Sequence, residues 1–149
     1  MKKLMIILSI ATLYASCKTE PDSQAIKKEL MNIHDKLMAD GAKVVNNRME
    51  LDSLLKSDRI QNNEDSLKIT DLVKRLNGAD EKMMDWMHFF KDDFKGKNEA
   101  EDLNYFKTEM VKIRGVEDDF IKVTRESDSV LKVYNIKPNG KMYMGHHKH

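Results

Sequence analysis

Cysteine is almost absent from this 149-residue chain, which contains only one, Cys17. A single thiol cannot form a disulfide within the chain. Proline is scarce too, since Pro21 and Pro138 are the two prolines and the long stretch between them has none. No run of alternating polar and β-branched residues indicates a strand. These absences exclude a disulfide scaffold and leave a long interior that is compatible with helix.

An excess of charge of one sign is also missing. Lys and Arg number 26, while Asp and Glu number 25. Removal of a leader that carries Lys2 and Lys3 lowers the basic count from 26 to 24 and removes no acid. A nearly neutral chain with interspersed charges offers no basic surface for nucleic acid. We therefore expect no nucleic-acid partner.

Motifs that carry catalysis are absent from the sequence. There is no glycine-rich phosphate loop, nucleophile elbow or His-Glu-x-x-His. The adjacent carboxylates at Asp92-Asp93 and Asp118-Asp119 are typical of solvated faces, because neighbours on a helix point apart. We expect the protein not to be an enzyme.

The N-terminus predicts a lipoprotein. Residues 1–16 comprise a basic start, an apolar run too short to cross a bilayer, and the small residues Ala15-Ser16 before Cys17. Cleavage before Cys17 and acylation of its thiol and amine would anchor the protein through two or three acyl chains. Tyr14 departs from the leucine usual in a lipobox, and the alternative is an ordinary secretory signal with a chance cysteine. The predicted location is the cell envelope, on the outer membrane and facing the periplasm or the surface.

Residues 17–23 then form the lipidated cysteine and a polar tether, with Asp22 or Ser23 as a helix cap. Residues 24–134 are expected to form the folded domain. Apolar residues three, four and seven apart predict helices over about 23–55, 64–90 and 99–134. Short polar connections favour antiparallel neighbours. The predicted fold class is all-α, as a three-helix up-down-up bundle or an antiparallel coiled coil.

The segment MMDWMHFF, Met83 to Phe90, combines three methionines with a histidine and three aromatic residues. On a helix, Met83, Trp86, Met87 and Phe90 share one stripe, which is typical of a core. The pair Met84 and His88 lies one turn apart on the flank of that stripe.

The first helix repeats this division. Met31, His34 and Met38 are spaced i, i+3 and i+7, so they share a face beside the main leucine and isoleucine stripe. In an antiparallel hairpin, residues near His34 could lie opposite Met83 to His88. Thioethers and imidazoles without thiolate suit copper, chiefly Cu(I), and the nearby Trp86 indole could add a cation–π contact.

Two other interpretations of these side chains stay open. Methionine fills cores and packs on aromatics, and a histidine at the edge of a stripe commonly makes only hydrogen bonds. Noncovalent haem between Met and His ligands is a further alternative. The candidate metal ligands in the bundle are Met31, His34, Met38, Met84 and His88.

Residues 135–149 are predicted to be a flexible Met/His-rich tail that starts with a Pro-Asn-Gly turn signal. His146, His147 and His149 are candidate ligands for Cu(II), Ni(II) or Zn(II), since short His-rich tracts bind metals. The sequence HHKH is too irregular for an added purification tag.

The segments MNIHDKLM, residues 31–38, and ADEKMMDWM, residues 79–87, together with the lipobox, resemble small Bacteroidota lipoproteins often labelled "viral A-type inclusion protein". The resemblance covers about residues 1–133 and leaves the tail out. It implies a lipoprotein with coiled-coil character and no viral biology, and the family has no assigned activity to carry over.

The sequence thus favours a membrane-anchored, non-catalytic helical module that binds another envelope protein or a second copy of itself. The alternative is a periplasmic copper or other transition-metal binding protein. An envelope chaperone or stress protein would have the same shape. If the protein binds another protein, we expect the Met/His flank to be buried with its sulfurs scattered. If it binds a metal, we expect three or more ligand atoms to converge on one point.

Overall fold

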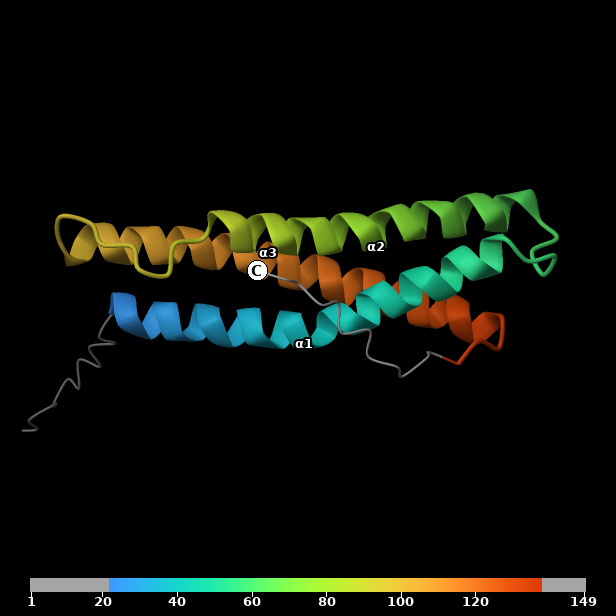
Figure 1. Cartoon of the computed structure of the whole chain (residues 1–149), viewed down its shortest axis with the longest axis horizontal. Helices are drawn as coiled ribbons and strands as arrows, with labels where there is room; N and C mark the ends of the chain where they lie inside the picture. Colours follow the sequence, from blue (N-terminus) through green and yellow to red (C-terminus); the bar gives the residue numbers. More distant parts are fainter. Residues whose placement is uncertain (1–21, 138–149) are drawn as a thin grey trace, which may run out of the picture.

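The computed structural model describes residues 22–137 and consists there of three long helices. They are α1, Ser23–Leu55, α2, Asn63–Phe89, and α3, Glu99–Val133. The chain runs up along α1, down along α2 and up along α3, so α1 and α3 are parallel (Figure 1). The predicted all-α, three-helix bundle is confirmed, and each predicted helix boundary lies within one residue of the observed one. The predicted leader (1–16), Cys17, and the tail residues His146, His147 and His149 lie outside the described residues.

Side-chain caps start all three helices. Asp22 Oδ1 accepts a hydrogen bond from the Ala25 amide (2.7 Å), which confirms one of the two predicted caps. Asn62 and Asn98 cap α2 and α3 in the same way, through the amides of Glu64 and Glu101. Each cap satisfies one of the amides that a helix N-terminus leaves without an intrahelical acceptor.

The C-terminus of α3 ends in a Schellman motif. Asn135 has a positive φ of 53°, a conformation that asparagine tolerates better than most residues. The Ile136 amide donates to the Leu131 carbonyl (2.9 Å), and the Asn135 amide donates to the Lys132 carbonyl (3.1 Å). Ile136 then packs against the core, as this motif favours.

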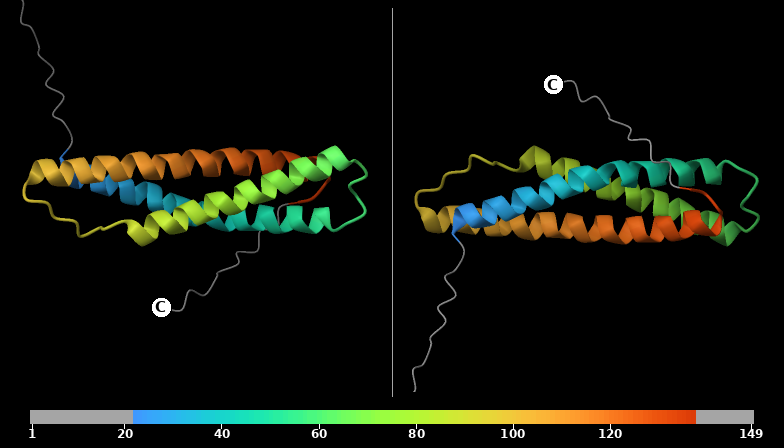
Figure 2. Two further views of the ribbon diagram at one scale, coloured as in Figure 1. Left: turned by 90° about the horizontal axis from the view of Figure 1, so that it is seen from above. Right: turned by 90° about the horizontal axis from the view of Figure 1, so that it is seen from below.

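The core follows the predicted apolar stripes. Figure 2 shows the three helices along one long axis, with α1 and α2 crossing each other at a shallow angle. Leu30, Leu51, Leu76, Ile113 and Leu131 are each fully buried. Trp86 and Met83 are buried as predicted, while Met87 and Phe90 are partly buried against the core. Among residues 22–137, no helix is long and apolar enough to cross a membrane.

One polar layer interrupts this core. Asn47 and Ser127 are fully buried, and the Asn47 amide donates to Ser127 Oγ and to Asp128 Oδ1 at 2.8 Å each. Such a buried pairing between α1 and α3 favours one register over its neighbours, because a slip would leave these polar groups buried without partners.

Candidate functional site

Each pair of helices meets along a seam, and we compare one hollow from each seam. The α1–α3 hollow has a volume of about 310 Å³, the α2–α3 hollow about 590 Å³ and the α1–α2 hollow about 250 Å³. They differ in the chemistry of their lining, and that difference decides which of them is a candidate site.

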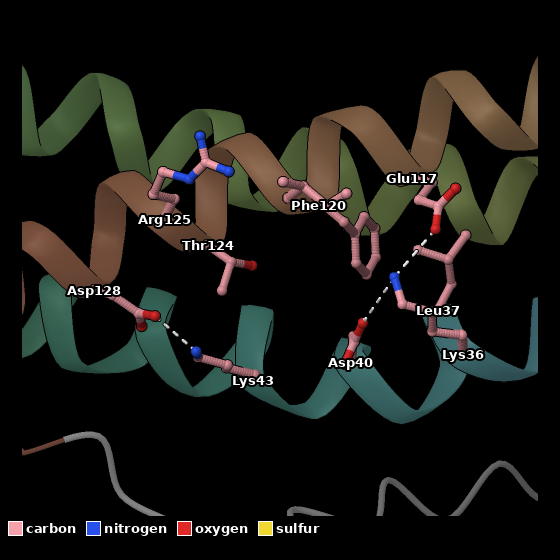
Figure 3. A pocket seen from close by; sticks show the side chains of 10 residues that line it. Lys36, Leu37, Asp40, Lys43, Glu117, Phe120, Thr124, Arg125 and Asp128 are labelled. Carbon is pink, nitrogen blue, oxygen red and sulfur yellow. Dashed lines mark hydrogen bonds and ion pairs between the residues drawn. The ribbon is translucent and has the colours of Figure 1, made fainter. Parts of the chain in front are cut away.

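Charged side chains line the α1–α3 hollow, and Figure 3 shows ion pairs closing it on both sides. Lys36 Nζ lies 3.1 Å from Glu117 Oε1 and 3.7 Å from Asp40 Oδ2, and Lys43 Nζ lies 2.6 Å from Asp128 Oδ2. Leu37 and Phe120 form its buried floor. These acids and lysines are already paired with one another, so among the charged side chains of the hollow only Arg125 has no ion pair within the described residues.

The directions of the pKa shifts in this hollow agree with paired charges. The hydrogen bond from Lys36 lowers the pKa of the Glu117 carboxyl, and the same bond raises the pKa of the Lys36 ammonium. Both shifts favour the charged forms that make the pair. We interpret the α1–α3 hollow as a structural clamp.

The α2–α3 hollow, which we call the aromatic groove, has an apolar floor. Trp86, Phe89 and Val116 line it, and Phe89 is 73% exposed although it is a large apolar side chain. Ion pairs flank the floor: Lys82 with Asp119 at 2.6 Å, and Lys112 with Glu109 at 2.7 Å. Gly115 also lines the groove, and a Cβ added there would meet no atom within 4 Å. An open apolar groove with a charged rim is suited to a side chain from a partner protein.

The α1–α2 hollow, which we call the Met/His seam, is lined by Met31, His34, Trp86, Met87, Phe90 and Asp92. His34 Nε2 lies 3.3 Å from Met87 Sδ, so the antiparallel register predicted for these segments is confirmed. The Trp86 ring stacks on Phe90, with centroids 4.6 Å apart, and lies tilted against the His34 ring, with centroids 5.9 Å apart. Its indole Nε1 is buried and has no hydrogen-bond partner among the described residues.

The loop over residues 90–98 covers the end of the seam. The Lys91 amide donates to the Tyr105 hydroxyl (2.7 Å), and Phe94 stacks on the Tyr105 ring with centroids 4.0 Å apart. Lys27 Nζ donates to the Asp92 carbonyl. These contacts place Asp92 at the rim of the Met/His seam.

Of the five metal ligands predicted in the bundle, two lie in the Met/His seam and three lie outside it. Met31 and His34 line the seam, but Met38 is 50% exposed, Met84 is 43% exposed, and His88 is exposed with its ring against Phe89 (centroids 4.9 Å). Met87, which we assigned to the core, takes the place facing His34. A helical wheel of α2 could not decide which methionine faces His34, because Met84 and Met87 both lie near the edge of the apolar stripe.

Residues 22–137 contain no group of three or more His, Cys, Asp or Glu side chains that could hold a metal ion. That finding speaks against a zinc- or manganese-type site in this part of the chain, since those metals favour such ligands. Thioethers are a different ligand class, and the Met/His seam contains two of them.

Comparisons with known proteins returned nothing. No family model, curated protein or solved structure matches this chain. The resemblance to Bacteroidota lipoproteins therefore stays a prediction from the sequence, and the chain is assigned to no family.

Proposed function

We propose that this protein is a lipid-anchored, non-catalytic binding module of the cell envelope, whose bundle docks another envelope protein in the aromatic groove. The observation that carries the proposal is Phe89, which is 73% exposed beside the apolar floor formed by Trp86 and Val116. Exposed aromatics at the rim of such a floor are typical of binding hot spots. The sequence before Cys17 supports the anchor.

The anchor has a direct test. Metabolic labelling with a fatty acid should mark the chain in cells and fail to mark a Cys17→Ser variant. Labelled chain should fractionate with the outer membrane, because two or three acyl chains bind stably. Equal labelling of the variant, or recovery of both forms without membranes, would contradict the anchor.

Docking is tested by site-specific cross-linking in the same cells. A photoreactive residue is placed at position 89, and a matched control at position 111, since Val111 on α3 is also 73% exposed but does not line the groove. We expect one major cross-linked partner from position 89 and none from position 111. Equal yields from the two positions would contradict docking in the groove.

A second variant separates docking from simple exposure. Gly115→Leu adds a side chain to the groove, and because its Cβ would meet nothing within 4 Å and leucine favours helix, the helix should remain intact. Cross-linking from position 89 should fall sharply in this variant. A cross-linked homodimer would identify a second copy as the partner, whereas many unrelated partners would indicate a chaperone.

Transition-metal binding is a second candidate function, and one observation favours it: a histidine nitrogen and a thioether sulfur lie 3.3 Å apart in a partly buried seam. Equilibrium dialysis of the full chain against Cu(I) tests it through the bound metal per chain. The test uses a variant in which His146, His147 and His149 are alanine, because the tail carries its own candidate ligands. Absence of bound copper in that variant would remove this second candidate.

A further inference from the structure

The contact between His34 and Met87 has an electronic mismatch. His34 Nδ1 lies 3.0 Å from Asp35 Oδ1, and because a carboxylate only accepts hydrogen bonds, we assign the ring proton of a neutral His34 to Nδ1. Nε2 of a neutral His34 then presents a lone pair. That lone pair faces the Met87 sulfur, which also only accepts. Two acceptors at 3.3 Å are in van der Waals contact and do not attract each other, and a positive centre bound by both would make the contact favourable.

A proton on Nε2 is one such centre, and a soft metal ion is the other. A carboxylate on the far nitrogen of a ligating histidine is the usual arrangement in metal sites, because it fixes the tautomer and the ring orientation. Asp35 supplies that carboxylate here. The arrangement at His34 therefore matches a metal-ligating imidazole.

The separation of the two atoms also fits a metal. With bonds of about 2.0 Å to an imidazole nitrogen and about 2.3 Å to a sulfur, ligand atoms 3.3 Å apart subtend about 100° at the metal. That angle suits three- or four-coordinate geometry. Because the two bonds sum to more than 3.3 Å, the metal would lie to one side of the line that joins the two atoms, and the His34 ring would turn to aim its lone pair at it.

The remaining lining suits a soft, monovalent ion. Met31 lies one turn before His34 and lines the same hollow, so a second thioether is within the site. Two thioethers and an imidazole without thiolate favour Cu(I) over zinc, manganese or magnesium. Trp86 offers an aromatic face to a cation, and Asp92 at the rim offers a compensating charge.

We propose that Met31, His34 and Met87 bind one Cu(I) ion in the Met/His seam, next to the indole of Trp86. This inference deepens the second candidate function and rests on it. Its failure would leave the docking proposal intact, since cross-linking from position 89 reports on the α2–α3 seam alone.

The experiment is an anaerobic titration of the full chain, in detergent, with Cu(I) against a chromogenic Cu(I) chelator. The three tail histidines are replaced by alanine in every sample. We expect one Cu(I) per chain, with affinity at least tenfold weaker in His34→Ala and in Met87→Leu. Met31→Leu should weaken binding as well. Met87→Leu removes the sulfur and nearly conserves side-chain volume, so it keeps the test valid if His34→Ala fails to fold.

The exposed flank of α2 supplies matched controls. Met84→Leu and His88→Ala make the same chemical changes outside the seam and should leave the affinity unchanged. Circular dichroism verifies the helix content of each variant. The proposal is overturned if the parent chain cannot compete with the chelator, if Met87→Leu binds as tightly as the parent, or if the flank variants lose binding equally.

A second signal comes from the protein itself. Trp86 is the only tryptophan in the chain, and it lines both the Met/His seam and the aromatic groove, so the Met87→Leu variant is needed to assign a fluorescence change to the seam. Ag(I), a soft ion that undergoes no redox change under these conditions, should quench the fluorescence of the parent chain at one equivalent and leave that of Met87→Leu unchanged. Equal quenching in both would contradict a site built on the Met87 sulfur.

Discussion

The two seams of α1, against α3 and against α2, differ in how their polar groups are paired. Against α3, α1 presents lysines that are paired with acids. It also presents buried Asn47, whose amide N–H donates to Ser127 and Asp128 while its Oδ1 has no partner among the described residues. Against α2, it presents a histidine nitrogen that faces a sulfur, beside an indole N–H that has no partner among the described residues. Paired charges across the α1–α3 seam indicate a structural role, whereas a ring nitrogen held against a thioether sulfur, beside this indole N–H, suits a bound ligand.

The largest effect should come from the floor of the α1–α3 seam. Leu37 is 1% exposed, so Leu37→Ala removes buried methyl groups and leaves a cavity. We expect a loss of about 2–5 kcal/mol in the free energy of unfolding. Urea denaturation followed by circular dichroism measures it. A loss no larger than that of an exposed-site variant such as Leu67→Ala would show that this seam is not the structural one.

The second-largest loss of stability should come from a change in the buried polar layer. Asn47→Ala removes the donor to Ser127 and Asp128 and leaves the partially buried Asp128 carboxylate with one partner fewer. We expect a loss of about 1–3 kcal/mol in unfolding free energy. Asn104→Ala, an exposed change on α3, is the control. Equal stability of the two variants would contradict a register-fixing role for the layer.

A smaller, pH-dependent effect is expected at Glu117. Its folded-state pKa is lowered, first by the hydrogen bond from Lys36, so the stability that it contributes is present above the unfolded value of 4.5. That stability is lost as the pH falls through the lowered pKa. Because Lys36 is half exposed, Glu117→Gln should cost no more than about 1 kcal/mol at pH 7.

The same two chains should become equally stable under acid conditions. Stability of the parent and of Glu117→Gln is compared from pH 7 down to well below 4.5, at low salt. A difference that persists unchanged in acid would show that the carboxylate charge is not its origin.

The smallest effect is expected on the flank of α2. Met84 is 43% exposed, so Met84→Leu should change the unfolding free energy by less than about 0.5 kcal/mol. Position 84 lies less than one helical turn from position 87, so this variant shows whether the seam or only its neighbourhood determines the effect of Met87→Leu. A larger loss of stability at Met84 than at Met87 would contradict the assignment of Met87 to the seam.

The sequence predicted the three helices closely because caps and apolar spacing are local signals. Asp22 and the stripe through Leu30 can be recognised within a single segment. It also predicted that His34 would lie opposite the Met83 to His88 segment, since short loops favour antiparallel neighbours. The Asn47–Ser127 pair could not be predicted, because the partners are 80 residues apart and no local pattern links them.

The candidate metal ligands could also be predicted only in part. Met31 and His34 were found from spacing on one helix, but the choice among Met84, Met87 and His88 depends on how α2 is rotated against α1. Helical periodicity alone does not fix that rotation for residues at the edge of a stripe. The distance between His34 and Met87 fixes it in the structure.

X-ray absorption of the Cu(I)-loaded chain, with the tail histidines replaced by alanine, tests the central claim most directly. If the mismatched seam is a soft-metal site, the copper should show one nitrogen at about 2.0 Å and two sulfurs at about 2.3 Å. The sulfur signal should fall by half in Met87→Leu. A copper environment of nitrogen and oxygen alone, unchanged by that substitution, would contradict the account and leave the Met/His seam a packing contact.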